Sequence, residues 1–451
     1  MAKLIPVDLT NNKPCILEYT TTDGQMLSFK EDAFESKIVS HTYSDIGRII
    51  FDKPITTIVK SAFWRCKSLT SITIPDSVTK IEGQAFRGCY SLKNLDIPDS
   101  VIEIGECVCC ACAALECINV VENNSVYKSV EGVLYDKKMT SIICLPKHYK
   151  TTFVIRDNVT KICKGAFCKC VFLESIDIPD SVIKIGVKAF NGCKNLTLIT
   201  IPNSVTEIGK CAFSGCTSLT SVTIPDSVTM IGEEAFSDCS GLTSVTIPNS
   251  VTTIGEEAFS DCRSLTSVTI PDSVTTIGGG AFSWCGSIKE FKGKFVSEDG
   301  RCLIVDGILK SFAPAGLTEY TIPNSVKEIG EEAFACCKNL TSITIPNSVM
   351  TIGRGVFRFC ESLKNVTIPD SVMTIGNYTF YKCKCLKNIT IGKGVSEIGK
   401  KAFEGCNIDT IVCCSKTPPK IEDSFCKFEN LIVPTGCEEA YANSDWGKYI
   451  E

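Results

Sequence analysis

Residues 219–241 read LTSVTIPDSVTMIGEEAFSDCSG, and nearly the same 23 residues begin again at Leu242 and at Leu265. A repeat this short cannot bury its own apolar side chains, so neighbouring copies must stack and cover one another. This stretch therefore decides the fold, and it predicts a solenoid in which each copy of the repeat forms one coil.

Alternating residues in the first half of the coil predict a short strand with one buried side. Leu219, Val222 and Ile224 are expected to face the core, whereas Thr223 faces solvent. Pro225 ends the strand, and the Asp-Ser pair after it suits a turn. The second half is expected to return to the core through a second short strand and two turns, with these residues: Val228, Ile231, Gly232, Ala235, Phe236 and Cys239.

The repeat extends over most of the chain. Its Phe recurs from Phe63 to Phe403, with Cys109 in its place in the third copy, and a Cys follows three residues later, so we count about 13 units. Solenoid ends need caps. We therefore predict an N-terminal cap at residues 1–50, a solenoid at 51–406, and a C-terminal cap at 407–451.

Three hairpins are expected outside the regular repeat. In the N-terminal cap, a hairpin is predicted from Ile16 to Phe29, turning at residues 22–24. The repeat is interrupted by insertions near 118–154 and 291–318. Each insertion contains a predicted hairpin, at residues 132–146 and 302–309, that we expect to project from one coil.

Charge and motif content exclude several classes of protein. The 451 residues carry 46 basic and 51 acidic side chains, and this near balance argues against nucleic acid as a partner. No apolar run approaches the roughly 20 residues of a membrane helix, so membrane insertion is not expected. The only histidines are His41 and His148, and no nucleotide-binding or hydrolase motif is present. We therefore predict neither an enzyme nor a bound cofactor.

The pattern IP[DN]SV, then IG, then AFxxC, at a step of 23 residues, resembles the BspA-like leucine-rich repeats, also called type-5 or Treponema-type repeats. The resemblance covers residues 51–406 nearly throughout. It implies a β-rich leucine-rich-repeat superhelix with a parallel β-sheet, 23-residue coils, capped ends and two hairpin insertions. It also implies protein binding or adhesion, often at microbial surfaces, without shared catalytic residues.

The outward positions of the main strand form the candidate binding surface. They make a hydroxyl-rich, almost uncharged face, and solenoids use such broad faces to bind ligands. The alternative is that Thr merely satisfies strand propensity on a wet surface. Specificity is expected beside the two insertions, where the residues vary most. The candidate residues are Asp96, Cys117, Asp177, Leu198, Thr200, Thr223, Thr246, Thr269, Glu319 and Thr344.

The chain has 29 cysteines, and the 13 that follow the repeat are expected to pack in the core as small apolar residues. A second group surrounds the first insertion. Cys110 and Cys168 share one position of the repeat, and Cys107 and Cys163 lie nearby in the sequence. We expect the side chains of Cys107 and Cys110 to lie outside the core. These four could form a disulfide or a soft-metal site, or remain unrelated thiols.

The leading hypothesis is therefore a non-catalytic protein-binding or adhesion module, with a protein ligand favoured and a glycan possible. The alternative is a Cys-rich metal-binding or redox-responsive repeat protein. The N-terminus shows no signal peptide, which favours the cytoplasm, whereas the family resemblance favours the cell surface.

Overall fold

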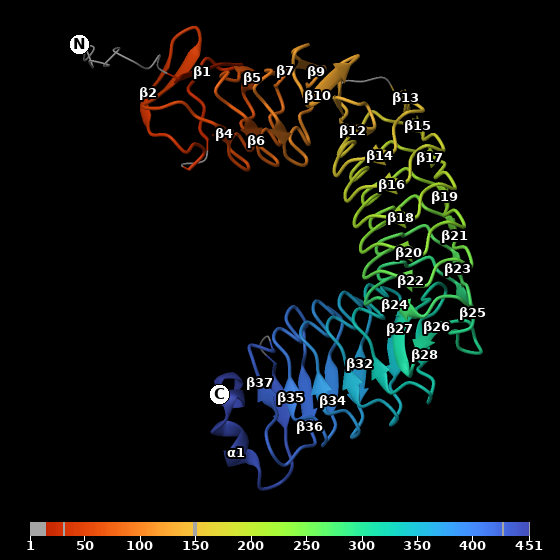
Figure 1. Cartoon of the computed structure of the whole chain (residues 1–451). Coiled ribbons are helices and arrows are strands. Elements are labelled where there is room, and N and C mark those ends of the chain that lie inside the picture. The colour runs from red at the N-terminus through yellow and green to blue at the C-terminus, as the bar shows by residue number, and fades with distance from the viewer. Residues whose placement is uncertain (1–14, 30–31, 148–150, 426–427, 451) are drawn as a thin grey trace. The chain divides into compact units, whose positions relative to one another are not determined.

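The computed structural model describes residues 15–29, 32–147, 151–425 and 428–450. It is a β-solenoid with about 23 residues in each turn, as the repeat predicts, and it has about 16 turns, more than the 13 units counted in the sequence (Figure 1). The chain divides into two compact units, Met1–Cys216 and Thr217–Glu451. Among the described residues, no helix is long and apolar enough to cross a bilayer.

Unit 1 begins with three antiparallel strands and continues with two parallel ladders, one on each side of the coil. The antiparallel strands are β1 (Cys15–Thr21), β2 (Ile38–Tyr43) and β3 (Gly47–Phe51). The main face holds β5 (Leu69–Thr73), β7 (Asn94–Ile97), β9 (Cys117–Val120), β13 (Thr152–Val154), β15 (Ser175–Asp177) and β17 (Leu198–Ile199). The short-strand side holds β4 (Thr57–Ile58), β6 (Lys80–Ile81), β8 (Glu103–Ile104), β10 (Tyr127–Val130), β11 (Val133–Asp136), β12 (Ser141–Cys144), β14 (Lys161–Ile162), β16 (Lys184–Ile185) and β18 (Glu207–Ile208).

Unit 2 also has two parallel ladders and ends in two short helices. Its main face holds β19 (Ser221–Thr223), β21 (Ser244–Thr246), β23 (Ser267–Ile270), β25 (Glu290–Gly293), β28 (Glu319–Thr321), β30 (Ser342–Thr344), β32 (Asn365–Ile368), β34 (Asn388–Ile391), β36 (Thr410–Cys413) and β38 (Asn430–Ile432). Its short-strand side holds β20 (Met230–Ile231), β22 (Thr253–Ile254), β24 (Thr276–Ile277), β26 (Cys302–Val305), β27 (Ile308–Phe312), β29 (Glu328–Ile329), β31 (Thr351–Ile352), β33 (Thr374–Ile375), β35 (Glu397–Ile398) and β37 (Lys420–Ile421). The helices are α1 (Glu438–Ala442) and the 3₁₀ helix η1 (Asp445–Tyr449).

The repeat places equivalent residues of neighbouring coils directly beside each other. In unit 2, Thr223 pairs with Thr246 on the main face, and Ile254 pairs with Ile277 on the short-strand side. The repeated phenylalanines stack inside the coil; the rings of Phe357 and Phe380 lie 5.2 Å apart at 14°. Both rings are fully buried, and each buried Phe contributes on the order of 1.5–3 kcal/mol to folding.

The turn that contains the repeated Phe, which we call the Phe corner, also joins neighbouring coils. It does so through its backbone and through the repeated thiol. The Phe259 N–H donates to the Ala281 carbonyl of the next coil at 2.8 Å. The Phe259 carbonyl in turn accepts the thiol of Cys285 at 3.1 Å. The same thiol bond joins Cys383 to Phe357 and Cys406 to Phe380. The core position predicted for these cysteines is confirmed, and the thiol bond adds a reason why Cys suits it.

Left-handed backbone geometry flanks each Phe, a feature that the sequence did not lead us to expect. Glu257 and Asp261, two residues before and two after Phe259, have φ of 51° and 61°. Their N–H groups donate to the next coil at 3.0 and 2.8 Å. Residues other than Gly adopt this conformation at a cost. The bonds between coils offset that cost, because they pair backbone groups that would otherwise be buried without partners.

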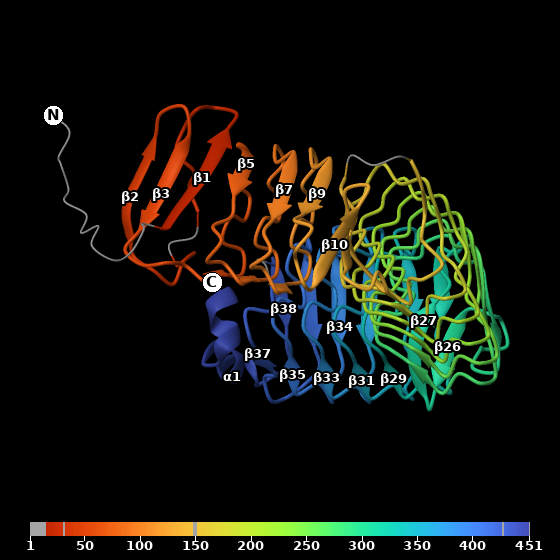
Figure 2. The ribbon, with the colours of Figure 1, turned by 45° about the horizontal axis from the view of Figure 1, so that its top comes forward.

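The predicted hairpin from Ile16 to Phe29 is wrong. The turn forms, with Gly24 at φ 63° and the Gln25 N–H bonded to Asp23. However, β1 pairs with β3 and β5, both antiparallel, as Figure 2 shows. The segment after the turn does not form the second strand of a hairpin but packs against the core. Leu27 is buried there, and its N–H donates to the Tyr19 hydroxyl at 3.1 Å.

Tyr19 organises this N-terminal end of unit 1. Its hydroxyl lies 2.6 Å from His41 Nε2, and burial raises the pKa of Tyr19 and lowers the pKa of His41. A Cβ at Gly47 would lie 2.2 Å from the Tyr19 ring, so only glycine fits there. His41 is thus half-buried against an aromatic ring, while His148 lies outside the described residues.

Both insertion hairpins form, but they do not project from the coil. β11 pairs antiparallel with β12, and β26 pairs antiparallel with β27. The last strand of each hairpin then joins the short-strand ladder in parallel, β12 beside β14 and β27 beside β29. Ile142 and Leu309 are fully buried and pair with Ile162 and Ile329, the Ile of the repeat. Burial of these apolar residues holds the hairpins in the solenoid.

Strand pairing continues beyond residue 406. β36 pairs with β34, β38 pairs with β36, and the Phe425 ring stacks on Phe403 at 4.8 Å. Tyr441 of α1 and Trp446 of η1 then cover part of the core, and Trp446 Nε1 donates to the Pro419 carbonyl at 2.9 Å. The cap boundaries at residues 50 and 406 stay predictions.

The stacked Phe ladder yields a stability prediction. Replacing Phe357 by Ala removes one buried ring between two others and leaves a cavity, so the free energy of unfolding should fall by about 3–5 kcal/mol. Urea unfolding followed by circular dichroism measures this change. Met373→Ala, at a half-exposed position of unit 2, should cost less than about 0.5 kcal/mol. Equal losses in the two variants would contradict a structural role for the stack.

Candidate protein-binding surface

The structure places the candidate residues on the outer side of the main-face strands. All are exposed except Cys117, which is half-buried. Unit 1 carries Asp96, Cys117, Asp177, Leu198 and Thr200, and unit 2 carries Thr223, Thr246, Thr269, Glu319 and Thr344. Leu198 is the apolar member of the set, with 58% of its surface exposed.

Side chains on this face pair with their equivalents in the next coil. Asn119 Nδ2 donates to Asp96 Oδ1 at 2.7 Å, and the Cys117 thiol donates to Asn94 at 3.0 Å. In unit 2, Asn388 donates to Asn365 at 2.9 Å. The register therefore aligns Cys117 with Asn94, and Asn119 with Asp96. These lateral bonds fix the side chains in rows, so part of their ordering cost is met before a ligand binds.

A shallow hollow of about 550 Å³ lies on the main face of unit 2 and brings one candidate residue together with several others. Thr344 lies there beside side chains from β32 and β34 and from the turns after them. Its lining offers hydroxyl, amide and carboxylate groups, which can donate and accept hydrogen bonds together. The polar residues and thiol of the hollow are Ser342, Thr344, Asn347, Asn365, Thr367, Asp370, Thr390 and Cys414.

A departure from the repeat shapes the hollow. Where most coils have Pro-Asp-Ser or Pro-Asn-Ser, one coil has Gly392-Lys393-Gly394. A Cβ at Gly392 would lie 2.6 Å from the Pro369 backbone, and one at Gly394 would lie 2.1 Å from the Asp370 carbonyl. The Lys393 N–H donates to Asp370 at 2.9 Å and lowers the pKa of that carboxyl. This break in the repeat could have indicated the hollow from the sequence, but the sequence analysis did not use it.

A second surface that sequence reasoning missed contains aromatic residues and cations. Trp284 and Phe359 both occupy the left-handed position after the repeated Phe, with φ of 63° and 58°, where several coils have Gly. Their rings lie 5.1 Å apart, and the guanidinium of Arg358 lies 5.3 Å from the Phe359 ring centroid. Bulky side chains are unusual in this conformation, so their presence is the signal for this surface.

Cys110 and Cys168 are joined by a disulfide, with Cα atoms 5.7 Å apart. Both residues are buried, so the expected position of Cys110 outside the core is wrong; the disulfide holds its side chain against the coil that follows the insertion. Cys107 and Cys163 remain half-buried thiols, and burial raises the pKa of each. In the part of the chain that the structure describes, no group of three or more His, Cys, Asp or Glu side chains could hold a metal ion.

Lys147 is buried beside the disulfide, which no sequence pattern indicated. Its ammonium donates to the Cys168 carbonyl and to the Cys170 thiol, the latter at 3.4 Å. Buried lysines need such partners because an unpaired buried charge is costly. Lys147 therefore ties the end of the first insertion to the coil that follows it.

The fold and its outward face define a class, the β-solenoids built from leucine-rich repeats. The family model described as "BspA type Leucine rich repeat region (6 copies)" matches residues 28–159, 160–289 and 309–432. The chain belongs to this BspA-type leucine-rich-repeat family. The resemblance inferred from the repeat is thereby confirmed.

Two solved structures of bacterial leucine-rich repeat proteins match nearly the whole chain. A leucine-rich cell surface protein from Faecalibacterium prausnitzii is 25% identical, with a TM-score of 0.54, and the match covers 94% of this chain and 99% of that one. A leucine-rich repeat protein from Bacteroides ovatus is also 25% identical, with a TM-score of 0.40 and coverage of 90% and 98%. A comparison with curated proteins finds no match.

Thiol exposure gives a chemical prediction. Burial raises the pKa of Cys66 to about 11 and that of Cys302 to about 12, and it also raises the pKa of Cys383 well above its ordinary value. Near neutral pH, iodoacetamide should therefore modify the exposed Cys385 and Cys414 well before these buried thiols. Peptide mass mapping of the native protein measures the order, and the urea-unfolded chain is the control. Modification of Cys383 as fast as Cys385 would contradict the structure.

Proposed function

We propose that this protein is a non-catalytic binding protein of the adhesion type, with a protein ligand on the main face of the solenoid. The hollow around Thr344 in unit 2 is the observation that carries the proposal. It gathers exposed hydroxyl, amide and carboxylate groups on a rigid sheet, and the lateral bond between Asn365 and Asn388 holds one edge of it in place. Rigid scaffolds that present polar groups in fixed positions favour specific binding.

A protein ligand is favoured over a glycan on the chemistry of the hollow. Among the described residues that line it, apolar contacts come from Ile343, Ile345 and Ile368, and no aromatic ring is present for a sugar to pack against. Backbone amides and carbonyls of a polypeptide match the mixed donors and acceptors of this lining. The similar Faecalibacterium protein is a leucine-rich cell surface protein, which supports a surface location for the proposed activity.

The proposal predicts that large side chains introduced into the hollow weaken ligand binding. We expect Thr344→Arg combined with Thr367→Arg to reduce binding at least about tenfold, because two long charged side chains would occupy the ligand's place. Purified extracellular matrix proteins and a glycan array, each tested against the intact protein, identify the ligand class and give the affinities.

The matched control places the same bulk on the opposite side of the coil. Thr276→Arg lies on an exposed short strand of unit 2 and should leave binding unchanged. A maleimide-linked biotin on Cys414 should block binding, whereas the same label on Cys385 should not. Equal binding of the ligand to all these variants would refute the proposed face. Binding to glycans alone would show that the ligand is a glycan and not a protein.

A redox-responsive role is the second candidate, and the disulfide favours it. Cys110 and Cys168 are 58 residues apart in sequence and connect the coils before and after the first insertion. Such a bond restricts the unfolded chain and so stabilises the folded one. A change in its oxidation state would therefore alter the stability of the insertion, which lies beside the variable residues Asp96, Cys117 and Asp177 of the main face.

Removing the disulfide tests this role. Cys110→Ala with Cys168→Ala should lower the free energy of unfolding by up to about 4 kcal/mol under oxidising conditions, the chain-entropy value for a loop of this length. Dithiothreitol should lower the stability of the unaltered protein by a similar amount and leave the double variant almost unchanged. Unfolding in urea with and without reductant measures both effects. An unaltered protein that does not respond to reductant would exclude the redox role.

A further inference from the structure

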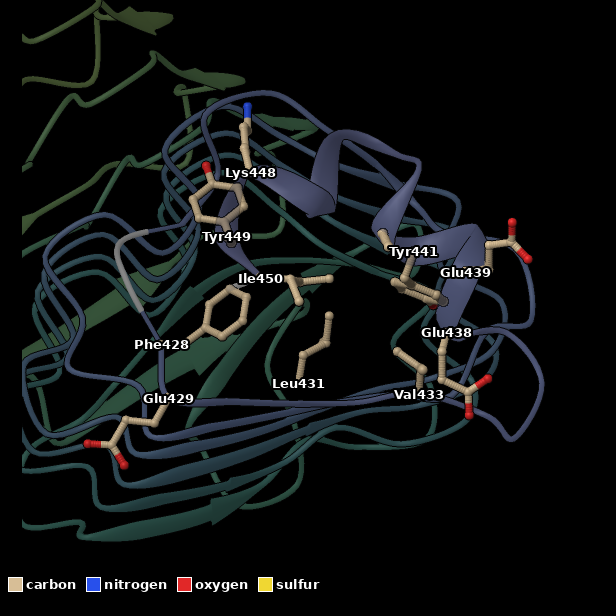
Figure 3. Close-up of a pocket in the computed structure, with 11 residues that line it drawn as sticks. Phe428, Glu429, Leu431, Val433, Glu438, Glu439, Tyr441, Lys448, Tyr449 and Ile450 are labelled. Carbon is tan, nitrogen blue, oxygen red and sulfur yellow. The ribbon is translucent and has the colours of Figure 1, made fainter.

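A large hollow lies at the end of unit 2, beside β38, the last strand of the main face (Figure 3). It measures about 980 Å³ and is enclosed by the segment around β38 on one side and by α1, η1 and Ile450 on the other. The apolar side chains of Phe428, Leu431, Val433 and Ile450 gather around its interior in the close-up. Its volume lies at the upper end of the range for ligand sites, enough for several side chains.

The hollow exists because the helices cover only part of the last coil. Tyr441 and Trp446 are fully buried, and the Tyr441 hydroxyl donates to the Ser415 carbonyl at 2.8 Å. Leu431 and Val433, in contrast, remain half-buried, and 39% of the Ile450 surface is exposed. The apolar residues that continue the core beyond the two helices are therefore left facing solvent.

The last strand also has an open edge. β38 pairs in parallel with β36 through Asn430, Leu431 and Ile432. Within the described part of the chain, no strand lies on its other side. An open strand edge offers backbone donors and acceptors to another extended segment. Ile432, on the outer side of the strand, is 53% exposed.

The rim of the hollow is acidic. Glu429 precedes β38, and Glu438 and Glu439 begin α1; all three are exposed. Figure 3 shows Glu429 at one end of the apolar group, and Glu438 and Glu439 at the other. Among the described residues that line the hollow, the one cation is Lys448, which lies 3.5 Å from the carboxylate of Asp423, outside the lining. The hollow therefore favours a cationic occupant.

We propose that this hollow binds an extended segment of a partner protein in which apolar side chains alternate with Lys or Arg. The segment adds to the open edge of β38 as one more strand of the parallel ladder. Alternate side chains of a strand point to opposite sides, so its apolar residues enter the hollow and its cations meet the glutamates. The proposal goes beyond the main-face function and uses different residues, so the two can fail separately.

A peptide of matching chemistry tests the proposal. The probe is the fluorescein-labelled hexapeptide Leu-Lys-Ile-Lys-Val-Lys, and its counterpart carries Glu in place of each Lys. Fluorescence anisotropy with the full chain should show binding of the Lys peptide only. Glu438→Lys combined with Glu439→Lys should weaken that binding about tenfold at low salt, because each exposed charge pair contributes only a modest part of the binding free energy.

The control pair is Glu397→Lys with Glu422→Lys, two exposed carboxylates of the same unit outside the hollow, and it should bind the peptide as the unaltered protein does. Thr344→Arg on the main face should also leave peptide binding unchanged. Hydrogen exchange should show new protection at residues 430–433 when the peptide is bound. Equal loss in both charge-reversal pairs, binding of the Glu peptide, or no new protection at 430–433 would overturn the proposal. Protection there that rises with protein concentration alone would assign the edge to a second copy instead.

Discussion

The contact on which the regular coils depend is the one that the Phe corner makes with the next coil. The Phe N–H donates to a carbonyl one coil ahead, and the Phe carbonyl accepts a thiol from that same coil. In the regular coils both bonds join copies that are 23 residues apart, so hydrogen bonding and ring stacking favour the same repeat length. The serine of the IP[DN]SV turn adds a third bond of this kind, as when Ser273 donates to the Val251 carbonyl at 2.7 Å.

Because this contact fixes the backbone, binding functions are left to the positions that take no part in the contact. The outward residues of the main strand carry no part of the core, so they can vary without loss of the coil. Departures from the repeat then mark the distinctive sites. Gly392 and Gly394 shape a hollow, Trp284 and Phe359 form an aromatic surface, and Cys110 and Cys168 connect coils on either side of an insertion.

The fold could be predicted because it follows from a local pattern repeated many times. Each inward Leu, Val, Ile and Phe is identified by comparison with a dozen equivalents, and the cysteines of the repeat are placed in the core by the same comparison. The hairpin at Ile16–Phe29 could not be judged in this way. Its partner strands, β3 and β5, are distant in sequence, and the local turn signal at residues 22–24 does not reveal that Leu27 is drawn to the Tyr19 hydroxyl. The burial of Cys110 and the end hollow likewise depend on where the first insertion and the terminal helices fold back.

The near-identical coils at residues 219–285 have a consequence for how such a chain can change over generations. Each coil there contacts its neighbours through the same residues in the same register, so a copy gained or lost leaves every remaining contact intact. Unequal recombination between copies would lengthen or shorten the outward surface one coil at a time. The coils next to the insertions lack this freedom, because the hairpins and the disulfide hold each of them to one particular neighbour.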